Sequence, residues 1–429
     1  MPETRSDEEA RPHVVILGAG FAGLYAARAL GKLPVRVTLV DRKNHHTFQP
    51  LLYQVATAGL NPGDIASPIR RIVRSNKNIR VFMAEAVGFD LENKSVKLEN
   101  VSVPYDYLIV ATGATHSYLA HPEWEHFAPG LKTVEDALEI RRRILLAFEE
   151  AERKKAVFGK HDPLNFVIVG GGPTGVELAG AIAEISRRVL VSDFHFIDPR
   201  SARVLLLEYA PRVLTSYPED LSQSAEKQLR KLGVEVRTGA MVTEVTPHSV
   251  KVGDEEIPSA VTLWAAGVKA SPLGAMLGEK TDKAGRVLVN QYLNLAGRPE
   301  VFVVGDLAWF IDSEGKTLPG VAPVAIQMGS NVARNISRDL RHESRKPFVY
   351  LDKGSMATIG RAAAVAMMGK LHLSGLLAWM AWLFIHILYL IGFRNRLVVL
   401  VEWLWAYLRF EKAARLITDD ECKHNSPHP

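Results

Sequence analysis

The sequence has almost no cysteine, and this absence excludes several kinds of site. Of its 429 residues only Cys422 is a cysteine, and it lies in a polar C-terminal stretch. A disulfide framework, a Cys-x-x-Cys redox pair and a thiolate metal cluster each need at least two cysteines. The chain can build none of them, and we expect no metal site.

A concentrated positive charge and an export signal are also missing. The net charge is only +5, whereas nucleic-acid binding needs basic residues clustered together with aromatic ones, a mixture found only near the C-terminus. We prefer a membrane explanation there and expect no nucleic-acid partner. Residues 1–12 are charged and have no apolar core, so they do not form a secretory signal. We expect them to be a disordered lead, and the body of the protein to face the cytoplasm.

Two glycine fingerprints stand out in a chain long enough for two or three domains of about 150 residues. Residues 18–23 read GAGFAG and residues 170–175 read GGGPTG; each follows an apolar run and opens onto a helix-forming stretch. The first glycine of such a motif permits a tight turn, the second lets the backbone approach a pyrophosphate, and the third brings the helix against the strand. The helix N-terminus adds free N–H donors. We therefore predict two dinucleotide sites.

An acidic residue ends the second strand predicted in each of these units. Residues 35–40 form that strand in the first unit and lead to Asp41, while residues 203–207 in the second lead to Glu208. A carboxylate there accepts hydrogen bonds from ribose hydroxyls and repels a 2′-phosphate, so the second site should prefer NADH over NADPH. Arg212 nearby leaves the strictness of that preference open. Glu208 lies far from its fingerprint, which predicts an insertion around residues 187–201; in the alternative interpretation both acids merely end strands.

Small-residue turns repeat in the two units. The predicted strand 105–110 runs into Ala-Thr-Gly at 111–113, and the strand 261–264 runs into Ala-Ala-Gly at 265–267, which supports two copies of a similar unit. A later buried strand, 301–304, closes with Gly305 and Asp306, where a carboxylate could bond a ribityl chain. The first unit is therefore interrupted by the second. Further predicted strands are 79–82, 234–236 and 242–245; predicted helices are 134–155 and 324–339.

The C-terminal region is apolar and aromatic. Residues 371–393 contain no Asp, Glu, Lys or Arg and qualify by length as a transmembrane candidate. The following stretch, 397–408, is too short to span a membrane and contains Glu402. Aromatic residues between flanking arginines favour helices that lie at the lipid headgroup boundary. A single span and a buried pair of dimer helices are the alternatives.

Taken together, these motifs resemble those of type II NADH dehydrogenase, the single-subunit, non-pumping NADH:quinone oxidoreductase. The resemblance extends from about residue 12 to residue 417 and rests on residues 18–23 with Asp41, 46–54 (HTFQPLLYQ), 111–114, 170–180 and 305–306. It implies an α/β fold of two Rossmann-like domains with C-terminal membrane-associated helices. The implied FAD domain spans 13–130 and 271–365, the inserted NADH domain 131–270, the membrane-association region 366–417, and a polar tail 418–429.

In that family the first fingerprint holds non-covalent FAD and the second holds NADH as co-substrate. The FAD residues implied are Gly18, Ala19, Gly20, Phe21, Ala22, Gly23, Asp41, Arg42, Gln54, Val87, Ala111, Thr112, Gly113, Asp306, Ala322 and Pro323. The NADH residues implied are Gly170, Gly172, Pro173, Thr174, Gly175, Glu177, Glu208, Ala266 and Gly267.

Two residues are candidates for a catalytic role through the resemblance. Glu177 matches a glutamate that looks onto the nicotinamide side of the flavin; alternatively it is a first-turn acid favoured by the helix dipole. The family's quinone motif, Ala-Gln-x-Ala-x-Gln, corresponds to residues 322–327. Gln327 stands at its second glutamine, whereas Pro323 replaces the first.

The implied reaction passes a hydride from NADH to FAD, and then two electrons and two protons to a membrane quinone. No multi-span helical bundle is predicted, so proton pumping is not expected. The missing cysteines argue against disulfide reduction and sulfide oxidation. Alternatives are a flavin reductase with another acceptor, of protein or sulfide:quinone type, and a non-catalytic NAD sensor. We expect a homodimer that is peripheral on the cytoplasmic face of the cell membrane, attached through residues 371–415.

Overall fold

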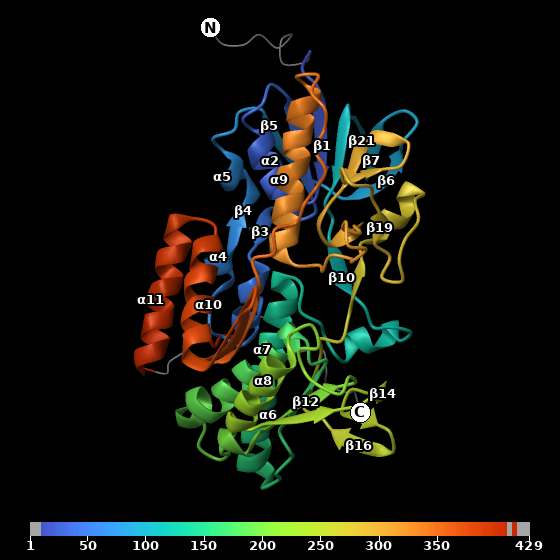
Figure 1. Cartoon of the computed structure of the whole chain (residues 1–429). Helices are drawn as coiled ribbons and strands as arrows, with labels where there is room; N and C mark the ends of the chain where they lie inside the picture. Colours follow the sequence, from blue (N-terminus) through green and yellow to red (C-terminus); the bar gives the residue numbers. More distant parts are fainter. Residues whose placement is uncertain (1–9, 410–413, 418–429) are drawn as a thin grey trace. The chain divides into compact units, whose positions relative to one another are not determined.

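The computed structural model describes residues 10–409 and 414–417, which divide into two compact units (Figure 1). Unit 1 consists of residues up to 46, 67–115 and 268–352; unit 2 consists of 47–66, 116–267 and 353 onward. Unit 1 is thus interrupted by a long segment of unit 2, and residues 47–66 also belong to unit 2. The predictions for residues 1–9 and for the tail 418–429, with Cys422, lie outside the described residues.

Unit 1 is built on a six-stranded sheet whose strands follow the order β20-β21-β9-β1-β2-β5. Pairing is parallel except between β20 and β21. The central strands are buried on both faces, as their unbroken apolar sequences require. The bounds are β1 (His13–Leu17), β2 (Arg36–Asp41), β5 (Ile79–Met83), β9 (Tyr107–Val110), β20 (Asn294–Leu295) and β21 (Arg298–Val303).

Two helices of unit 1, α2 (Phe21–Leu30) and α9 (Ala322–Asp339), pack closely against each other. Gly329 permits this approach, since a Cβ there would lie 2.1 Å from the carbonyl oxygen of Ala22. The remaining elements of this unit are α5 (Ile69–Val73), the antiparallel strands β6 (Ala86–Asp90), β7 (Ser95–Leu98) and β8 (Ser102–Pro104), the pair β19 (Val287–Leu288) and β22 (Ala308–Trp309), and the 3-10 turns η6 (Pro272–Leu277) and η7 (Gly305–Leu307).

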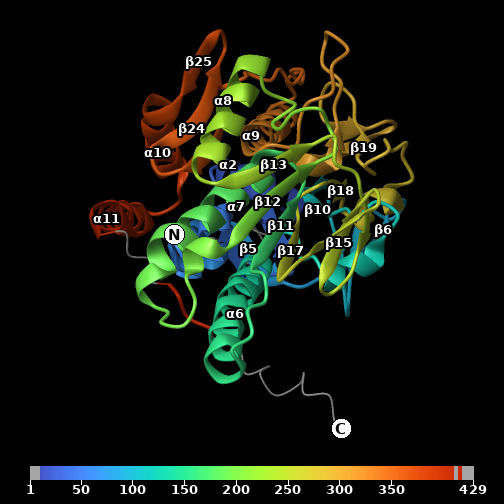
Figure 2. The ribbon, with the colours of Figure 1, turned by 90° about the horizontal axis from the view of Figure 1, so that it is seen from below.

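Unit 2 contains a second parallel sheet, in the order β13-β12-β11-β17 (Figure 2). Its strands are β11 (Asn165–Val169), β12 (Arg203–Glu208), β13 (Val234–Thr238) and β17 (Val261–Trp264), and its helices are α6 (Val134–Phe158), α7 (Pro173–Glu184) and α8 (Glu219–Lys231). The predicted insertion is present as η3 (Ile185–Val189), η4 (Leu190–Ser192) and η5 (Pro199–Ser201). An antiparallel sheet of β14 (Val242–Val245), β15 (Ser249–Val252) and β16 (Glu255–Pro258) follows.

Short elements complete the connections. Residues 47–66 contribute η1 (Gln49–Leu51), α3 (Leu52–Ala56) and α4 (Pro62–Ile65), and η2 (Pro122–His126) precedes α6. Short strands stand where the chain passes from one unit to the other: β3 (His45–Thr47), β4 (Ala66–Pro68), β10 (Ala114–His116) and β18 (Val268–Ala270). The predicted strands and helices are therefore found, with shifts of a few residues at their ends.

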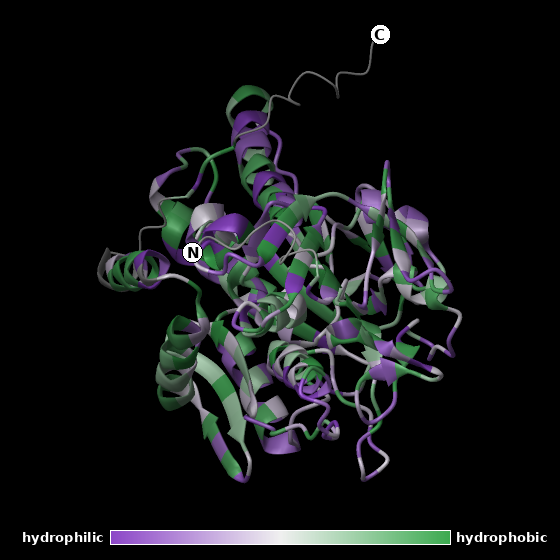
Figure 3. Cartoon of the chain, turned by 90° about the horizontal axis from the view of Figure 1, so that it is seen from above, coloured by the Kyte–Doolittle hydropathy of each residue, from purple (hydrophilic) through white to green (hydrophobic). Residues whose placement is uncertain are grey.

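The apolar C-terminal region is not one continuous segment. An antiparallel sheet of β23 (Ser355–Gly360), β24 (Ala363–Met368) and β25 (Leu371–Ser374) precedes α10 (Gly375–Tyr389) and α11 (Phe393–Arg409). The transmembrane candidate 371–393 therefore starts as a strand and contains a helix of only 15 residues. Within the described residues, no helix has the length and apolar character needed to cross a bilayer. Figure 3 shows α10 coloured largely hydrophobic.

Candidate functional site

The first glycine fingerprint has the steric features expected of a dinucleotide turn. Gly18 has a φ of +95°, and a Cβ there would lie 2.4 Å from the carbonyl oxygen of Ala111. A Cβ on Gly23 would lie 1.8 Å from the oxygen of Gly18, whereas a Cβ on Gly20 would meet nothing within 4 Å. The first and third glycines are therefore required by the protein itself, and the second borders open space.

The second fingerprint repeats this geometry in unit 2. Gly170 has a φ of +108°, and a Cβ there would lie 2.6 Å from the oxygen of Ala265. A Cβ on Gly175 would lie 1.8 Å from the oxygen of Gly170, and Gly172 again borders open space. The repeated small-residue turns at 111–113 and 265–267 thus have one steric role, because each lies directly against the first glycine of its fingerprint.

The helices that follow the fingerprints begin without a side-chain cap. Gly20 caps α2 and Gly172 caps α7, and neither has a side chain that could accept the first N–H groups. Pro173 occupies the start of α7, where a missing N–H costs nothing. The N–H groups and the positive dipole end of each helix are therefore available to an anionic ligand such as a pyrophosphate.

The predicted acids close both turns. Asp41 Oδ2 accepts the N–H of Ala19 at 2.6 Å, and its Oδ1 accepts the N–H of Lys43 at 2.8 Å. Glu208 Oε2 accepts the N–H of Gly171 at 2.5 Å. Both acids therefore stand beside their fingerprints, at the carboxyl end of the second strand, where a ribose would lie.

The side chain of Arg212 forms hydrogen bonds with the loop after β12. Its guanidinium donates to the backbone oxygens of Tyr217 at 2.8 Å, Thr215 at 2.9 Å and Leu214 at 3.3 Å. The side chain thus holds the loop after β12 in shape and has donated several of its N–H groups to that loop.

A cavity of about 510 Å³ in unit 1 collects many of the predicted FAD residues. Its lining includes Gly18, Asp41, Arg42, Val87 and Thr112. The Oγ1 atom of Thr112 is buried and has no protein partner within the described part of the chain. Buried hydroxyls are normally hydrogen-bonded, so this atom suits a polar ligand in the cavity. The uncapped helix, the carboxylate and the free hydroxyl together fit the dinucleotide part of FAD.

Further predicted FAD residues lie elsewhere in unit 1. Asp306 follows Gly305, whose φ is +74°, in η7. Ala322 and Pro323 open α9, whose cap residue Val321 supplies no side-chain hydrogen bond. At this helix start Pro323 has no N–H, and the N–H groups of Val324 and Ala325 both donate to the backbone oxygen of Val321. Gln54, in contrast, belongs to unit 2.

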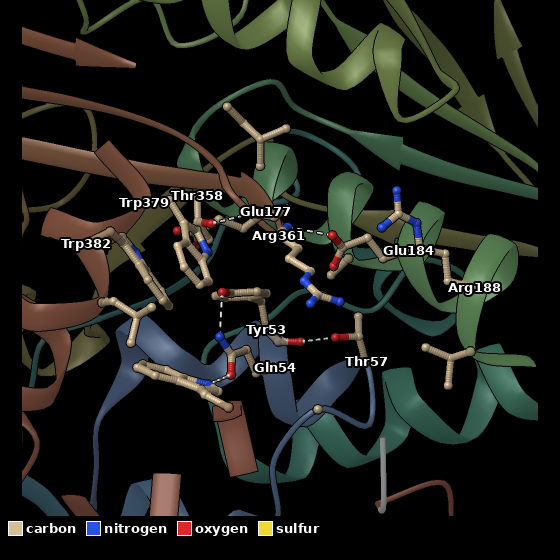
Figure 4. Close-up of a pocket in the computed structure, with 17 residues that line it drawn as sticks. Tyr53, Gln54, Thr57, Glu177, Glu184, Arg188, Thr358, Arg361, Trp379 and Trp382 are labelled. Atoms are coloured by element: carbon tan, nitrogen blue, oxygen red, sulfur yellow. Dashed lines mark hydrogen bonds between the residues drawn. The ribbon is translucent and has the colours of Figure 1, made fainter. Parts of the chain in front are cut away.

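Unit 2 contains a smaller cavity, of about 140 Å³, with a largely apolar and aromatic wall (Figure 4). In Figure 4, Trp379 and Trp382 lie on one side, Glu184 and Arg188 on the other, and Tyr53 and Gln54 below. Flat apolar rings are suited to such a wall. The residues that line it are Tyr53, Gln54, Thr57, Gly59, Glu177, Ala181, Glu184, Arg188, Val189, Thr358, Ile359, Gly360, Arg361, Trp379, Trp382, Leu383 and Trp403.

Glu177 lies in this aromatic cavity. It stands on α7 beyond the first turn, so the interpretation as a dipole-favoured first-turn acid does not hold. Burial raises the pKa of its carboxyl to about 8, against the opposing effect of a hydrogen bond with the backbone of Thr358. The carboxyl is therefore mostly protonated at neutral pH and can donate a proton into the cavity.

Gln54 and Tyr53 are tied together at the floor of the aromatic cavity. Gln54 Nε2 donates to the Tyr53 hydroxyl at 2.8 Å, and Gln54 Oε1 accepts the indole N–H of Trp403 at 2.8 Å. Burial raises the pKa of Tyr53 well above its usual value, so its hydroxyl stays protonated. The amide of Gln54, predicted to bind FAD, thus bonds protein groups at both ends.

Gln327 is also engaged by the protein. Its Nε2 donates to the oxygen of Leu351 at 2.9 Å, and its Oε1 accepts the N–H of Leu351 at 3.0 Å. Gln327 belongs to unit 1 and Glu177 to unit 2. The side chain therefore fixes the backbone at residue 351, and any contact with a ligand would add to that role.

The aromatic residues of the cavity are not among the predicted site residues. Trp379 and Trp382 belong to the apolar stretch 371–393 expected at the lipid headgroup boundary, yet both line the cavity, and Trp382 is only 2% exposed. Trp379, Trp382 and His386 follow the i, i+3, i+7 spacing of one helix face, which could have indicated a buried aromatic stripe. No motif pointed to Thr358 or Arg361.

Family models match most of the chain. The model of the pyridine nucleotide-disulphide oxidoreductases matches residues 12–329, and that of the NDH2 C-terminal domain matches residues 353–409.

Two curated relatives come from Mycobacterium tuberculosis. The chain is 44% identical to the type II NADH:quinone oxidoreductase Ndh over 427 residues, which cover 96% of this chain and 91% of the relative. It is 46% identical to the type II NADH:quinone oxidoreductase NdhA, covering 92% of this chain and 86% of the relative. Among solved structures, NDH2 from Plasmodium falciparum in complex with NADH has the same fold, with a TM-score of 0.85 at 19% identity, covering 95% of this chain and 100% of that one.

Proposed function

Because the chain belongs to the pyridine nucleotide-disulphide oxidoreductase family, and within it to the type II NADH:quinone oxidoreductases, we propose that it oxidises NADH and reduces a quinone through non-covalent FAD. Protons are not pumped in this reaction, and no thiol takes part. The observation that carries the proposal is the duplicated turn: each fingerprint packs its first glycine on a small-residue turn and is closed by an acid.

The proposed division of labour follows the two units. Unit 1 holds FAD in the cavity lined by Gly18, Asp41 and Thr112, with the N-terminus of α2 toward the pyrophosphate. When bound, the flavin accepts a hydride from NADH and passes two electrons to the quinone. Unit 2 holds NADH at the N-terminus of α7, where Glu208 accepts from the ribose. The engagement of Arg212 with loop oxygens supports a preference for NADH over NADPH.

We place the quinone in the aromatic cavity of unit 2. Its tryptophans and Leu383 suit a flat apolar ring, and Glu177 supplies a proton at neutral pH. The complete reaction is balanced: the quinone, NADH and one proton yield the quinol and NAD⁺. Glu177 is thus the group proposed to donate a proton to the quinone, in place of the nicotinamide contact that the family resemblance alone implies.

Membrane attachment is proposed to occur through the exposed faces of α10 and α11. On α10, Leu376, Met380, Phe384 and Leu388 follow helical spacing and are each about half or more exposed. On α11, Leu397, Val401, Leu404 and Trp405 are similarly exposed. Such faces fit a monotopic attachment to one leaflet. The proposal places the protein on the cytoplasmic face of the cell membrane, as a homodimer.

Anaerobic stopped-flow spectroscopy tests the reaction. The purified flavoprotein is mixed with NADH or NADPH and then with a short-chain quinone, while the flavin absorbance is followed. We expect bleaching by NADH, much slower bleaching by NADPH, and recovery on addition of quinone. Bleaching without recovery would contradict quinone as the acceptor and favour a protein acceptor, and a flavin that NADH leaves oxidised would favour a sensor.

A further inference from the structure

The indole N–H of Trp382 is a buried hydrogen-bond donor without a partner. Trp382 is 2% exposed, and its Nε1 atom has no partner within the described residues. The indole N–H groups of two other tryptophans of unit 2 have acceptors: Trp403 Nε1 donates to Gln54 at 2.8 Å, and Trp264 Nε1 donates to the oxygen of Ser117 at 2.8 Å. Since buried tryptophan N–H groups are normally bonded, the one on Trp382 requires an explanation.

The ring of Trp382 is held in place by contacts with two other rings. It stacks on His386 with ring centroids 4.3 Å apart and planes at 28°, and it lies against Trp403 at 5.3 Å. His386 is fixed in turn, because its Nδ1 lies 2.7 Å from the backbone oxygen of Trp382 and its ring meets Phe48 edge to face. The indole cannot turn to find another partner without breaking this stack, so its N–H direction is set before any ligand arrives.

Trp382 lines the same cavity as Glu177 (Figure 4). Two other polar side chains at this wall have protein partners: Gln54 bonds Tyr53 and Trp403, and Glu184 accepts the backbone N–H of Arg361 at 2.5 Å. The indole N–H is therefore a donor that the protein leaves for a ligand. The matching ligand has an oxygen acceptor on a flat apolar ring.

We propose that the Nε1–H of Trp382 donates a hydrogen bond to a carbonyl oxygen of the quinone, and that Trp382 thereby selects acceptors that have such an oxygen. This inference rests on the proposed function and adds a specificity-determining residue to it. A site that pairs a substrate oxygen rejects analogues that lack the oxygen, because its buried donor is then left unpaired.

The test compares wild type with Trp382→Phe, which keeps an aromatic ring and removes the N–H. We expect the KM for a short-chain quinone such as menadione to rise about 3- to 10-fold, as the loss of one hydrogen bond predicts. The rate with ferricyanide, an acceptor that needs no carbonyl contact, should stay the same. 2-Methylnaphthalene has the ring of menadione without its oxygens, so it cannot accept the hydrogen bond from Trp382. It should therefore inhibit menadione reduction equally in the variant and in wild type.

Trp309→Phe serves as the matched control, because Trp309 lies in unit 1 and its N–H donates to Thr317. Benzothienylalanine at position 382 keeps the bicyclic shape without the N–H and covers the case in which Trp382→Phe fails to fold. An unchanged menadione KM in either protein would overturn the inference, as would an equal loss of ferricyanide and menadione activity. Failure of wild type to reduce menadione, while it still reduces ferricyanide with NADH, would instead reject the proposed function.

Discussion

Glu208 and Gly171 are joined by a hydrogen bond of 2.5 Å from the glycine N–H to the glutamate Oε2. The other carboxylate oxygen accepts the N–H of Ala210 at 2.7 Å. Asp41 makes the same contact with Ala19 in unit 1, at 2.6 Å. The end of the second strand is thus tied to the second residue of the glycine turn in both units, which positions a negative charge where a ribose would lie.

The first prediction concerns the choice between NADH and NADPH. Glu208→Ala removes the acceptor for the ribose hydroxyls and the charge that repels a 2′-phosphate. A charge-assisted hydrogen bond contributes about 1.5–3 kcal/mol, so the KM for NADH should rise about 10- to 100-fold, while the KM for NADPH changes much less. Steady-state kinetics with both nucleotides measures the ratio of the KM for NADH to the KM for NADPH. Glu255→Ala, at a surface ion pair with Arg237, is the control, and an unchanged NADH/NADPH ratio would contradict the role of Glu208.

The second prediction separates the glycines of the first fingerprint. In Gly23→Ala the new Cβ would lie 1.8 Å from the oxygen of Gly18, so the turn cannot form and flavin should be lost together with stability. In Gly20→Ala the Cβ meets no protein atom within 4 Å, so the protein should fold and still bind flavin poorly. Flavin content and thermal melting measure the two effects. Gly88→Ala, also sterically free, should keep both, and full flavin occupancy in Gly20→Ala would contradict a pyrophosphate at this turn.

The third prediction concerns pH. Burial raises the pKa of Glu177 to about 8 from a usual value of 4.5. The folded state therefore holds this proton more tightly than the unfolded state, and the stability contribution is fully present below pH 4.5 and is lost as pH rises toward 8. Glu177→Gln cannot ionise, so its stability relative to wild type should improve over that interval.

Activity should follow the same titration. Quinone reduction by wild type should fall above about pH 8, as Glu177 loses its proton, and this alkaline limb should be absent in Glu177→Gln, whose overall rate is lower. Ferricyanide reduction, which takes up no proton, serves as the control in both proteins. The same alkaline limb in the variant would exclude Glu177 as the titrating group.

The fourth prediction concerns membrane attachment. Leu377 and Phe384 on α10 are 66% and 67% exposed, so replacing both with Gln should leave the fold intact. Since each large apolar side chain contributes up to about 1.5–3 kcal/mol when buried, binding to phospholipid vesicles should weaken about 10-fold or more. Co-sedimentation measures it. Val349→Gln changes an apolar side chain of unit 1 that is 81% exposed and is the control; equal sedimentation of both variants would contradict attachment through α10.

Local rules were enough to predict the fingerprints and their strands. The positions of Gly18 and Gly170 follow from turns that only glycine can form, and the buried parallel strands follow from unbroken apolar runs. The residues around Trp382 could not be found in this way. The ring contacts of Trp382 with Trp403, and the bond from Trp403 to Gln54, join parts of the chain far apart in sequence. An apolar helix has the same sequence pattern whether it packs on protein or faces lipid, so the pattern of residues 371–393 predicts contact with the membrane and cannot distinguish it from the protein contacts of Trp382.

The last prediction concerns Gln327, where sequence and structure give two roles to one side chain. The motif assigned it to quinone, and the structure shows two hydrogen bonds to the backbone of Leu351, at 2.9 and 3.0 Å. Gln327→Leu removes both bonds, so stability should fall by about 1–3 kcal/mol, visible as a lower melting temperature.

If the backbone contact is the whole role of Gln327, flavin bleaching by NADH and reoxidation by quinone keep their wild-type rates below the melting transition. If Gln327 also contacts quinone, we expect only reoxidation to slow. Gln223→Leu, on the surface of α8 beside Glu219, controls for the loss of an amide, and a melting temperature that does not change in Gln327→Leu would contradict the structural role.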